Sequence, residues 1–328
     1  MRTFRQDLWK ADEYTYKAAY GFMPNIHAFL HEEDNENRKC MLVVPGGGYC
    51  MLAPHEGELP AMQYYKMGMN VFVLTYTNDI TMCVPLKRQP MEDLSRAIRL
   101  IRKNAADYHI LPDKLFICGF SAGGHVCACV STHFADIADP DKDLAGISNR
   151  PDGTILCYPV ITTGEYTHIY SIQALLGKNP SKEELDYFSL EKQVTADTPP
   201  CFLWQTLEDS LVPVENTYLF AKALKEKGIP YAHYVFPHGN HGLSVANMEM
   251  FSGWHGGEYV NEQLGLTLEH VKDNTAVDLT EQRREELMQQ FFAPKPEGTP
   301  QGFPPLTENP FEDVAEWVKL SEIWLGRI

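Results

Sequence analysis

Short apolar runs alternate with longer amphipathic stretches along the chain from about residue 40 onward. This alternation is typical of βαβ units, which build a mostly parallel sheet with helices on both faces. The apolar runs predict strands at residues 40–44, 71–75, 114–118, 154–157, 200–205 and 232–236. Residues 26–30 predict an extra strand at an edge of the sheet. The amphipathic stretches predict helices at residues 59–67, 91–108, 121–134 and 214–227.

Residues 247–310 interrupt this rhythm. Thr280 is a suitable N-cap for a helix that runs through 285–292, and the prolines between 294 and 305 then preclude regular structure. Residues 311–325 are again periodic and predict a terminal helix packed on the sheet. We therefore expect residues 1–328 to form a single α/β domain that carries 247–310 as an inserted segment.

The pentapeptide Gly119-Phe120-Ser121-Ala122-Gly123 lies between a predicted strand and a predicted helix. In a G-x-S-x-G nucleophile elbow the serine occupies a cramped strand-to-helix turn, where a Cβ on either flanking glycine would collide with backbone. A helix that begins at Ser121 directs free N–H groups at an oxyanion formed there, and the N–H of Ala122 is the expected donor. The context therefore predicts that Ser121 is a nucleophile.

A serine nucleophile needs a histidine to accept its proton and a carboxylate to orient that histidine. In sheets that carry this elbow, the acid and then the histidine follow the serine along the chain, each on a loop after a strand. Asp209 follows one predicted strand, and His241 follows the last strand in a glycine-rich loop. We prefer His241 to its rival His238, because the glycine-rich loop around His241 allows a close approach to Ser121. We prefer Asp209 to its rival Glu208, whose side chain would leave the turn in another direction, and both rivals stay open.

Two further histidine arrangements favour structural roles. His125 stands one helical turn after Ser121, and we expect it to hydrogen-bond a neighbouring loop rather than to take part in catalysis. His238, His241 and Asp209 lack the spacing of known metal motifs, so we expect no metal and no cofactor.

The segment Pro45–Tyr49 contains three consecutive glycines and directly follows the first strong strand. Lipases and esterases place at this point a glycine-rich loop whose N–H groups complete the oxyanion hole. The alternative interpretation is a flexible turn, which would be the default without the elbow.

Composition narrows the classes of partner. The formal net charge of -16, from 28 basic and 44 acidic residues, disfavours nucleic acid, whose phosphate backbone requires a basic face. No run of 18 apolar residues is present, and the polar first ten residues lack the apolar core of a signal peptide. We therefore expect a cytoplasmic protein that binds no membrane, with its eight cysteines as free thiols.

With these residues, the chain resembles the α/β-hydrolase superfamily, and within it the carbohydrate esterase and acetyl xylan esterase group related to bifunctional feruloyl and acetyl esterases. The likeness covers about residues 40–247 and the terminal helix. The segments that carry it are 44–49, 55–58, 119–125, and the stretch from Trp204 through Asp209 to Leu243.

The resemblance implies hydrolysis of small esters by Ser121, Asp209 and His241 without a cofactor. Acetyl groups on plant-polysaccharide fragments are the leading substrate class that it implies. It also implies that Gly47 and Gly48 donate hydrogen bonds to the oxyanion.

Pro45 stands where esterases with a His-Gly-Gly-Gly loop have histidine, a difference that the acetyl xylan esterase group often shares. The chain departs from the group itself in two places. His55 stands where the group commonly has arginine. The larger departure is segment 247–310, because the group usually passes from the histidine loop almost directly to the terminal helix.

The inserted segment begins a few residues after His241, so we expect it to lie over or beside the active site as a lid or subsite wall. Trp254, His255 and Tyr259 offer a sugar-stacking surface on it, and Tyr49 and Trp254 are the candidate substrate-binding residues. A contact in a homo-oligomer or a mobile excursion is the alternative for this segment.

The leading interpretation is a serine esterase that removes acetyl groups from oligosaccharides. A broad short-chain carboxylesterase and a peptidase of the prolyl-oligopeptidase type are alternatives, although no gating domain precedes the fold in this sequence. A non-catalytic binding protein with a hydrolase fold is the alternative from another class. Its sign would be a broken triad or a blocked oxyanion loop, and the sequence shows neither.

Overall fold

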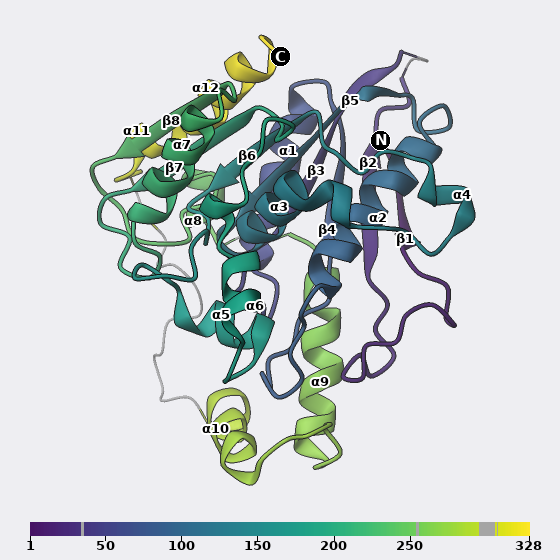
Figure 1. Cartoon of the computed structure of the whole chain (residues 1–328), viewed down its shortest axis with the longest axis vertical. Coiled ribbons are helices and arrows are strands. Elements are labelled where there is room, and N and C mark those ends of the chain that lie inside the picture. The colour runs from purple at the N-terminus through teal and green to yellow at the C-terminus, as the bar shows by residue number, and fades with distance from the viewer. Residues whose placement is uncertain (34–35, 254–255, 295–305, 307) are drawn as a thin grey trace.

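A central sheet with helices on both faces organises the chain (Figure 1). The computed structural model describes residues 1–33, 36–253, 256–294, 306 and 308–328. Within these residues the sheet has eight strands in the order β1-β2-β4-β3-β5-β6-β7-β8. The strands are β1 (Arg2–Asp7), β2 (Asn25–Leu30), β3 (Arg38–Val44), β4 (Asn70–Thr75), β5 (Ile110–Phe120), β6 (Gly153–Cys157), β7 (Cys201–Thr206) and β8 (Tyr231–Phe236). Strand β2 is antiparallel to both of its neighbours, and the other adjacent pairs are parallel.

Helices connect the strands and cover the sheet. The α-helices are α1 (Glu58–Lys66), α2 (Gln89–Lys103), α3 (Ser121–His133), α4 (Lys142–Ala145), α5 (Ile169–Leu176), α6 (Lys182–Tyr187), α7 (Glu215–Glu226), α8 (Met248–Phe251), α9 (Glu262–Lys272), α10 (Glu281–Phe292), α11 (Glu312–Ala315) and α12 (Trp317–Leu325). The short 3₁₀ helices are η1 (Pro54–Glu56), η2 (Phe134–Asp136), η3 (Leu190–Lys192) and η4 (Glu258–Asn261). Among the described helices, none combines the length and the apolar character needed to cross a membrane.

Burial on both faces explains why the central strands are continuous apolar runs rather than alternating ones. Every residue of β4, β6 and β7 is buried. Helices α1 and α12 lie together on one face, where the Tyr64 and Ser321 hydroxyl groups are 3.0 Å apart. Helices α2, α3 and α7 cover the other face. This architecture confirms the predicted α/β fold with helices on both faces of a mostly parallel sheet.

The predicted edge strand at 26–30 is a strand, but it is not at the edge. It forms β2, which lies between β4 and an additional strand, β1, that the hydrophobic pattern did not predict. Strand β1 is largely exposed, and its sequence alternates charged and polar residues around Phe4. An outer strand of this kind needs little apolar surface, so it leaves little hydrophobic signal.

Two predicted helices differ from the observed ones at their ends. Helix α2 ends at Lys103 rather than at residue 108, because the following turns place Tyr108 against Phe4 of β1, with ring centroids 5.3 Å apart. The predicted terminal helix 311–325 is divided into α11 and α12 at Glu316.

The described part of segment 247–310 contains α8, α9 and α10. The N-cap at Thr280 is present, since its side chain accepts a hydrogen bond from the Arg283 N–H. Helices α9 and α10 pack around a small apolar cluster that contains Ile80, Val271 and Leu287. Because Ile80 follows β4, both helices lie beyond the carboxyl edge of the sheet, at the lower end of the view in Figure 1. Trp254 and His255, named above as a sugar-stacking surface, lie outside the described residues.

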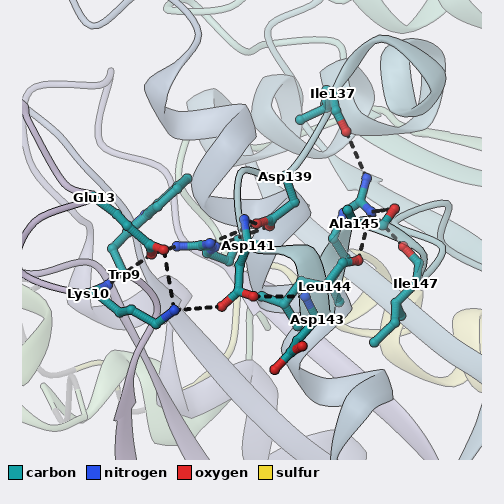
Figure 2. A network of polar contacts seen from close by, with 12 residues as sticks. Trp9, Lys10, Glu13, Ile137, Asp139, Asp141, Asp143, Leu144, Ala145 and Ile147 are labelled. Carbon is teal, nitrogen blue, oxygen red and sulfur yellow. Dashed lines mark hydrogen bonds and ion pairs between the residues drawn. The ribbon is translucent and has the colours of Figure 1, made fainter.

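A buried ionic network ties the N-terminal segment to α2 (Figure 2). The guanidinium of Arg96 donates to both carboxylate oxygens of Asp139, at 3.1 and 2.7 Å, and also to Glu13. It lies 4.0 Å from the centroid of the Trp9 ring, which provides a cation–π contact. Arg96 is 1% exposed, so removing either partner of its ion pair with Asp139 would leave the other charge buried and unpaired.

Replacing Arg96 with methionine is expected to lower the free energy of unfolding by about 3–5 kcal/mol, because it leaves the buried carboxylate of Asp139 without its partner. Urea denaturation followed by circular dichroism measures this change. Lys103→Met is the matched control: Lys103 also lies on α2 and pairs with an aspartate, Asp143, but both side chains are exposed. That variant is expected to stay within about 1 kcal/mol of wild type, and similar losses for both variants would contradict the proposed role of burial.

Candidate active site

Ser121 occupies a sharp turn between β5 and α3. Its φ is +50°, a backbone conformation that costs a non-glycine residue about 1–2 kcal/mol. The flanking glycines are required: a Cβ on Gly119 would lie 2.4 Å from the carbonyl oxygen of Gly123, and one on Gly123 would lie 2.2 Å from that of Val44. The strained turn presents the Ser121 side chain at the carboxyl end of β5, as the pentapeptide predicts.

A chain of hydrogen bonds links Ser121, His241 and Asp209. The Nε2 atom of His241 lies 2.8 Å from Ser121 Oγ, and its Nδ1 atom lies 2.7 Å from Asp209 Oδ2. The other carboxylate oxygen of Asp209 accepts from the backbone N–H groups of Leu211 and Val212, at 3.0 and 2.9 Å. These bonds hold Asp209 so that Nδ1 carries the imidazole proton and Nε2 is free to accept the serine proton.

The two rival residues pair with each other instead. The Nδ1 atom of His238 lies 3.1 Å from Glu208 Oε1, and both side chains are more than half exposed. Both ring nitrogens of His241 are engaged by Ser121 and Asp209. His238, His241 and Asp209 therefore do not converge on a common point, and within the described residues no group of three or more His, Cys, Asp or Glu side chains is arranged to hold a metal ion.

The glycine-rich loop after β3 lies directly against the nucleophile. A Cβ on Gly46 would come within 2.8 Å of the Ser121 Cβ. Gly47 and Gly48 have φ values of +121° and +66°, in the region that favours glycine. No described residue accepts a hydrogen bond from the backbone N–H of Gly47, Gly48 or Ala122. These three N–H groups are therefore not engaged by the described part of the chain.

His125 and Tyr49 are both buried behind the site. The Nε2–H of His125 donates to the Phe188 carbonyl at 3.0 Å, so its Nδ1 accepts from the Tyr49 hydroxyl at 2.7 Å. Burial lowers the pKa of His125 to about 4, which keeps the imidazole neutral. His125 thus has the structural role expected for it. The prediction that Tyr49 binds substrate needs correction, because its side chain is 1% exposed and bonded within the core.

Glu56 is a buried carboxylate that links the loops around Ser121, and sequence reasoning assigned it no role. Its Oε2 atom accepts from the Gly46 N–H at 2.8 Å, and its Oε1 atom accepts from the Tyr158 hydroxyl at 2.7 Å. The Tyr158 hydroxyl in turn accepts from the Ser244 N–H at 2.9 Å, in the loop that carries His241. A single side chain therefore holds both the glycine-rich loop and the histidine loop. The acidic residue next to a glycine was a visible signal, but its partners are distant in sequence.

The first turn of α5 also borders the site. His168 Nδ1 and Ser171 Oγ are 2.7 Å apart, and Ser171 Oγ lies 3.7 Å from the position of a Cβ on Gly48. Burial, and secondarily the nearby His241, lower the pKa of His168. Neither residue was singled out from the sequence, because nothing in their local pattern shows that α5 packs beside the glycine-rich loop. Tyr259 is partly buried and stacks on His27 of β2, with ring centroids 3.6 Å apart.

The arrangement has the chemical features of acyl transfer. It contains a serine hydroxyl within hydrogen-bond distance of a histidine, a carboxylate that hydrogen-bonds the same histidine, and backbone N–H groups that no described residue engages. Comparison with known proteins agrees with this assessment. The family model for BD-FAE matches residues 26–224, a range that contains Ser121 and Asp209.

Two curated relatives have names that refer to xylan. Endo-1,4-beta-xylanase B of Butyrivibrio fibrisolvens is 64% identical over 263 residues, which cover 80% of this chain and 41% of the relative. Acetylxylan esterase of Xylanibacter ruminicola is 31% identical over 219 residues, which cover 64% of this chain and 42% of the relative. The chain thus spans about two fifths of the length of these relatives.

A solved structure is similar over nearly its whole length. The acetyl ester-xyloside bifunctional hydrolase from Caldicellulosiruptor lactoaceticus has a TM-score of 0.71 and 35% sequence identity, over 84% of this chain and 98% of that one. The two relatives and this structural neighbour are all hydrolases by name.

Proposed function

Because this chain belongs to the BD-FAE family and has the α/β-hydrolase fold, we propose that it is a serine esterase that hydrolyses short acyl esters through Ser121, His241 and Asp209. The observation that carries the proposal is the continuous hydrogen-bond chain from Ser121 Oγ through the imidazole to Asp209, at 2.8 and 2.7 Å. A serine alcohol reacts with an ester only when such a base removes its proton.

In the first half of the reaction, Ser121 Oγ attacks the acyl carbon while its proton passes to His241 Nε2. The carbonyl oxygen becomes an oxyanion that accepts hydrogen bonds from the N–H groups of Gly47, Gly48 and Ala122. Each such donor contributes about 2.7–4 kcal/mol of transition-state stabilisation in comparable sites. Collapse of the tetrahedral intermediate breaks the ester bond, and the departing alcohol takes the proton from His241.

In the second half, water attacks the acyl group on Ser121 and gives a proton to His241. The same N–H groups stabilise the second oxyanion. Its collapse breaks the bond to Ser121 Oγ, which takes the proton from His241, so the carboxylic acid is released and the Ser121 hydroxyl is restored. Asp209 keeps its charge throughout and stabilises the imidazolium that forms in both halves.

The substrate class proposed is an acetyl ester on oligosaccharides derived from plant polysaccharides. This substrate class is supported by the names of two similar proteins, the acetylxylan esterase of X. ruminicola and the acetyl ester-xyloside bifunctional hydrolase of C. lactoaceticus. These names describe the substrates of those two proteins, and we infer the substrate of this chain from its similarity to them.

The xylanase name of one relative raises glycoside hydrolysis as a second candidate. Glycosidases place two carboxyl groups about 5–9.5 Å apart on either side of the scissile bond. Asp209 and Glu56 are both buried, and all four of their carboxylate oxygens accept hydrogen bonds from the protein. Neither is placed to protonate a leaving sugar, so the geometry favours ester hydrolysis.

The proposal is tested by measuring acetate release from acetylated xylo-oligosaccharides and manno-oligosaccharides, beside 4-nitrophenyl acetate and butyrate. Unsubstituted xylan, followed by its reducing ends, and an N-acetylated amino-acid anilide serve as glycosidase and peptidase arms. Acetate from the oligosaccharides supports the proposal. Cleavage of the nitrophenyl esters alone would leave a broad short-chain esterase, and activity only in the xylan or anilide arm would overturn the assignment.

Glu56→Gln is expected to lower kcat by about 10²-fold with little change in KM, because a displaced oxyanion loop weakens transition-state binding more than substrate binding. A glutamine cannot accept hydrogen bonds from Gly46 and Tyr158 with two equivalent oxygens. The measurement is the steady-state hydrolysis of 4-nitrophenyl acetate.

Glu58→Gln is the matched control for this variant. Glu58 lies two residues further on, and its carboxylate accepts from the Gly257 N–H at 3.1 Å, in the inserted segment. That variant is expected to keep kcat close to wild type. Equal rates for the two variants would show that Glu56 does not position the loop.

A further inference from the structure

A cleft of about 490 Å³ lies between α5, the loop after β4 and helix α10 of the inserted segment. Its lining includes Thr81, Tyr170, Gln173, Lys178, Arg283 and Glu286, and we name it the α5–α10 cleft. Its volume falls within the range of about 300–1,000 Å³ that is usual for ligand sites.

Two walls of this cleft extend from the oxyanion loop. Helix α5 contributes Tyr170 and Gln173 to the cleft, and its Ser171 lies beside Gly48. The loop after β4 contributes Thr81, and the Asp79 N–H of the same loop donates to the Tyr49 carbonyl at 3.0 Å. Both segments therefore contact the glycine-rich loop and also line the cleft, so they connect the cleft to the loop that precedes Ser121 in the proposed site.

The third wall is fixed rather than loosely attached. Arg283 of α10 donates to the carbonyl oxygens of Thr81 and Ile80, at 3.2 and 2.9 Å. The apolar cluster around Ile80 and Leu287 packs beneath these bonds. Because α10 is already bonded to the loop after β4, binding of a ligand does not incur the entropic cost of ordering this wall.

The chemistry of the lining matches a neutral, hydroxyl-rich ligand. Tyr170 is 63% exposed and offers an aromatic face to C–H groups. No described residue hydrogen-bonds the side chains of Tyr170, Gln173 or Lys178, so their polar atoms are available to hydroxyl groups. The lining carries two cations, Lys178 and Arg283, and two acids, Asp278 and Glu286, and this balance does not select for a charged ligand.

We propose that the α5–α10 cleft binds the saccharide chain of the substrate while the acetyl group lies at Ser121. This inference rests on the proposed esterase function and adds where the sugar portion binds. It also gives the inserted segment a role: α10 supplies a wall of the cleft, with Tyr170 as a stacking surface on the opposite side.

The test compares wild type, Tyr170→Ala, Tyr170→Phe and Gln173→Ala on acetylated xylotetraose, acetylated xylose and 4-nitrophenyl acetate. The readout is the ratio of kcat/KM on acetylated xylotetraose to kcat/KM on 4-nitrophenyl acetate. Tyr170→Ala is expected to lower this ratio about tenfold, mostly through KM, and to abolish any preference for xylotetraose over xylose. Tyr170→Phe keeps the aromatic face and is expected to keep most of the ratio.

Tyr218→Ala is the matched control, because Tyr218 is an exposed tyrosine on α7, outside the lining of the cleft. It is expected to leave the ratio unchanged. Isothermal titration of wild type with unacetylated xylotetraose gives a readout that needs no hydrolysis, and binding weakened by Tyr170→Ala supports the cleft.

Two failures are distinguishable. If wild type releases acetate from the saccharides but Tyr170→Ala and Gln173→Ala leave the ratio and the titration unchanged, the cleft inference is overturned and the esterase function stands. If wild type cleaves 4-nitrophenyl acetate but no acetylated saccharide, the proposed substrate is wrong and the cleft inference falls with it.

Discussion

Replacing Ser121 with alanine is expected to lower kcat for 4-nitrophenyl acetate about 10⁶-fold, to the residual rate supplied by binding and the oxyanion donors. The loss is this large because the hydroxyl supplies the bond to the acyl carbon, and no described neighbour replaces it at 2.8 Å from His241. The Ala122 N–H and the glycine-rich loop remain in place, so the variant tests the nucleophile and not the loop.

The loss must be separated from misfolding. Ser121 is buried in a strained turn, so the variant is checked by far-UV circular dichroism and by its thermal unfolding midpoint. Labelling with a fluorophosphonate supplies an independent readout: wild type and Ser148→Ala, an exposed serine remote in sequence from the elbow, are expected to take one label each, and Ser121→Ala none. A folded Ser121→Ala protein that still takes the label, or keeps its rate, would refute the assignment.

Replacing Asp209 with asparagine is expected to lower kcat about 10⁴-fold, because it reverses the histidine tautomer. The Oδ1 atom of Asp209 accepts from the Leu211 and Val212 N–H groups, so an asparagine must place its carbonyl oxygen there. The NH₂ group of the asparagine then faces Nδ1 of His241. Because an NH₂ group only donates, Nδ1 must accept the hydrogen bond and therefore carries no proton. The imidazole proton moves to Nε2, where it blocks transfer from Ser121.

Glu208→Gln is the matched control for Asp209→Asn. It changes the adjacent acid by the same chemistry, but Glu208 lies at the surface and pairs with His238. Steady-state kinetics on 4-nitrophenyl acetate are expected to show wild-type rates for this variant. A large loss in Glu208→Gln and a small one in Asp209→Asn would reverse the assignment of the acid.

Local chemistry made much of this protein predictable from its sequence. Buried parallel strands require continuous apolar runs, so the central strands and the main helices could be located, and the comparisons confirm the α/β-hydrolase fold. The elbow was also predictable, because the collisions that demand Gly119 and Gly123 arise within one strand–turn–helix unit. Strand β1 was not predicted, because an exposed outer strand does not require a continuous apolar run.

The choice between neighbouring side chains rested on weaker grounds, because the sequence favours Asp209 and His241 but leaves Glu208 and His238 open. Asp209 and Glu208 are adjacent in sequence, and only the direction of each side chain from the loop places one beside His241 and the other beside His238. Tyr49 adjoins the glycine-rich loop, yet its ring turns inward to His125. The local sequence shows that a polar or aromatic residue is present near the site, but it does not show in which direction the side chain of that residue points.

The sequence by itself therefore determined the order of the sheet elements along the chain, the elbow and the set of candidate triad residues, because these depend on local sterics and periodicity. Only the tertiary structure decided which acid and histidine join Ser121, that Glu56 links the glycine-rich loop to the histidine loop, and that α5 and α10 enclose a cleft beside them. These features depend on how loops far apart in sequence meet at the carboxyl edge of one sheet, and that meeting is fixed by the packing of the whole fold.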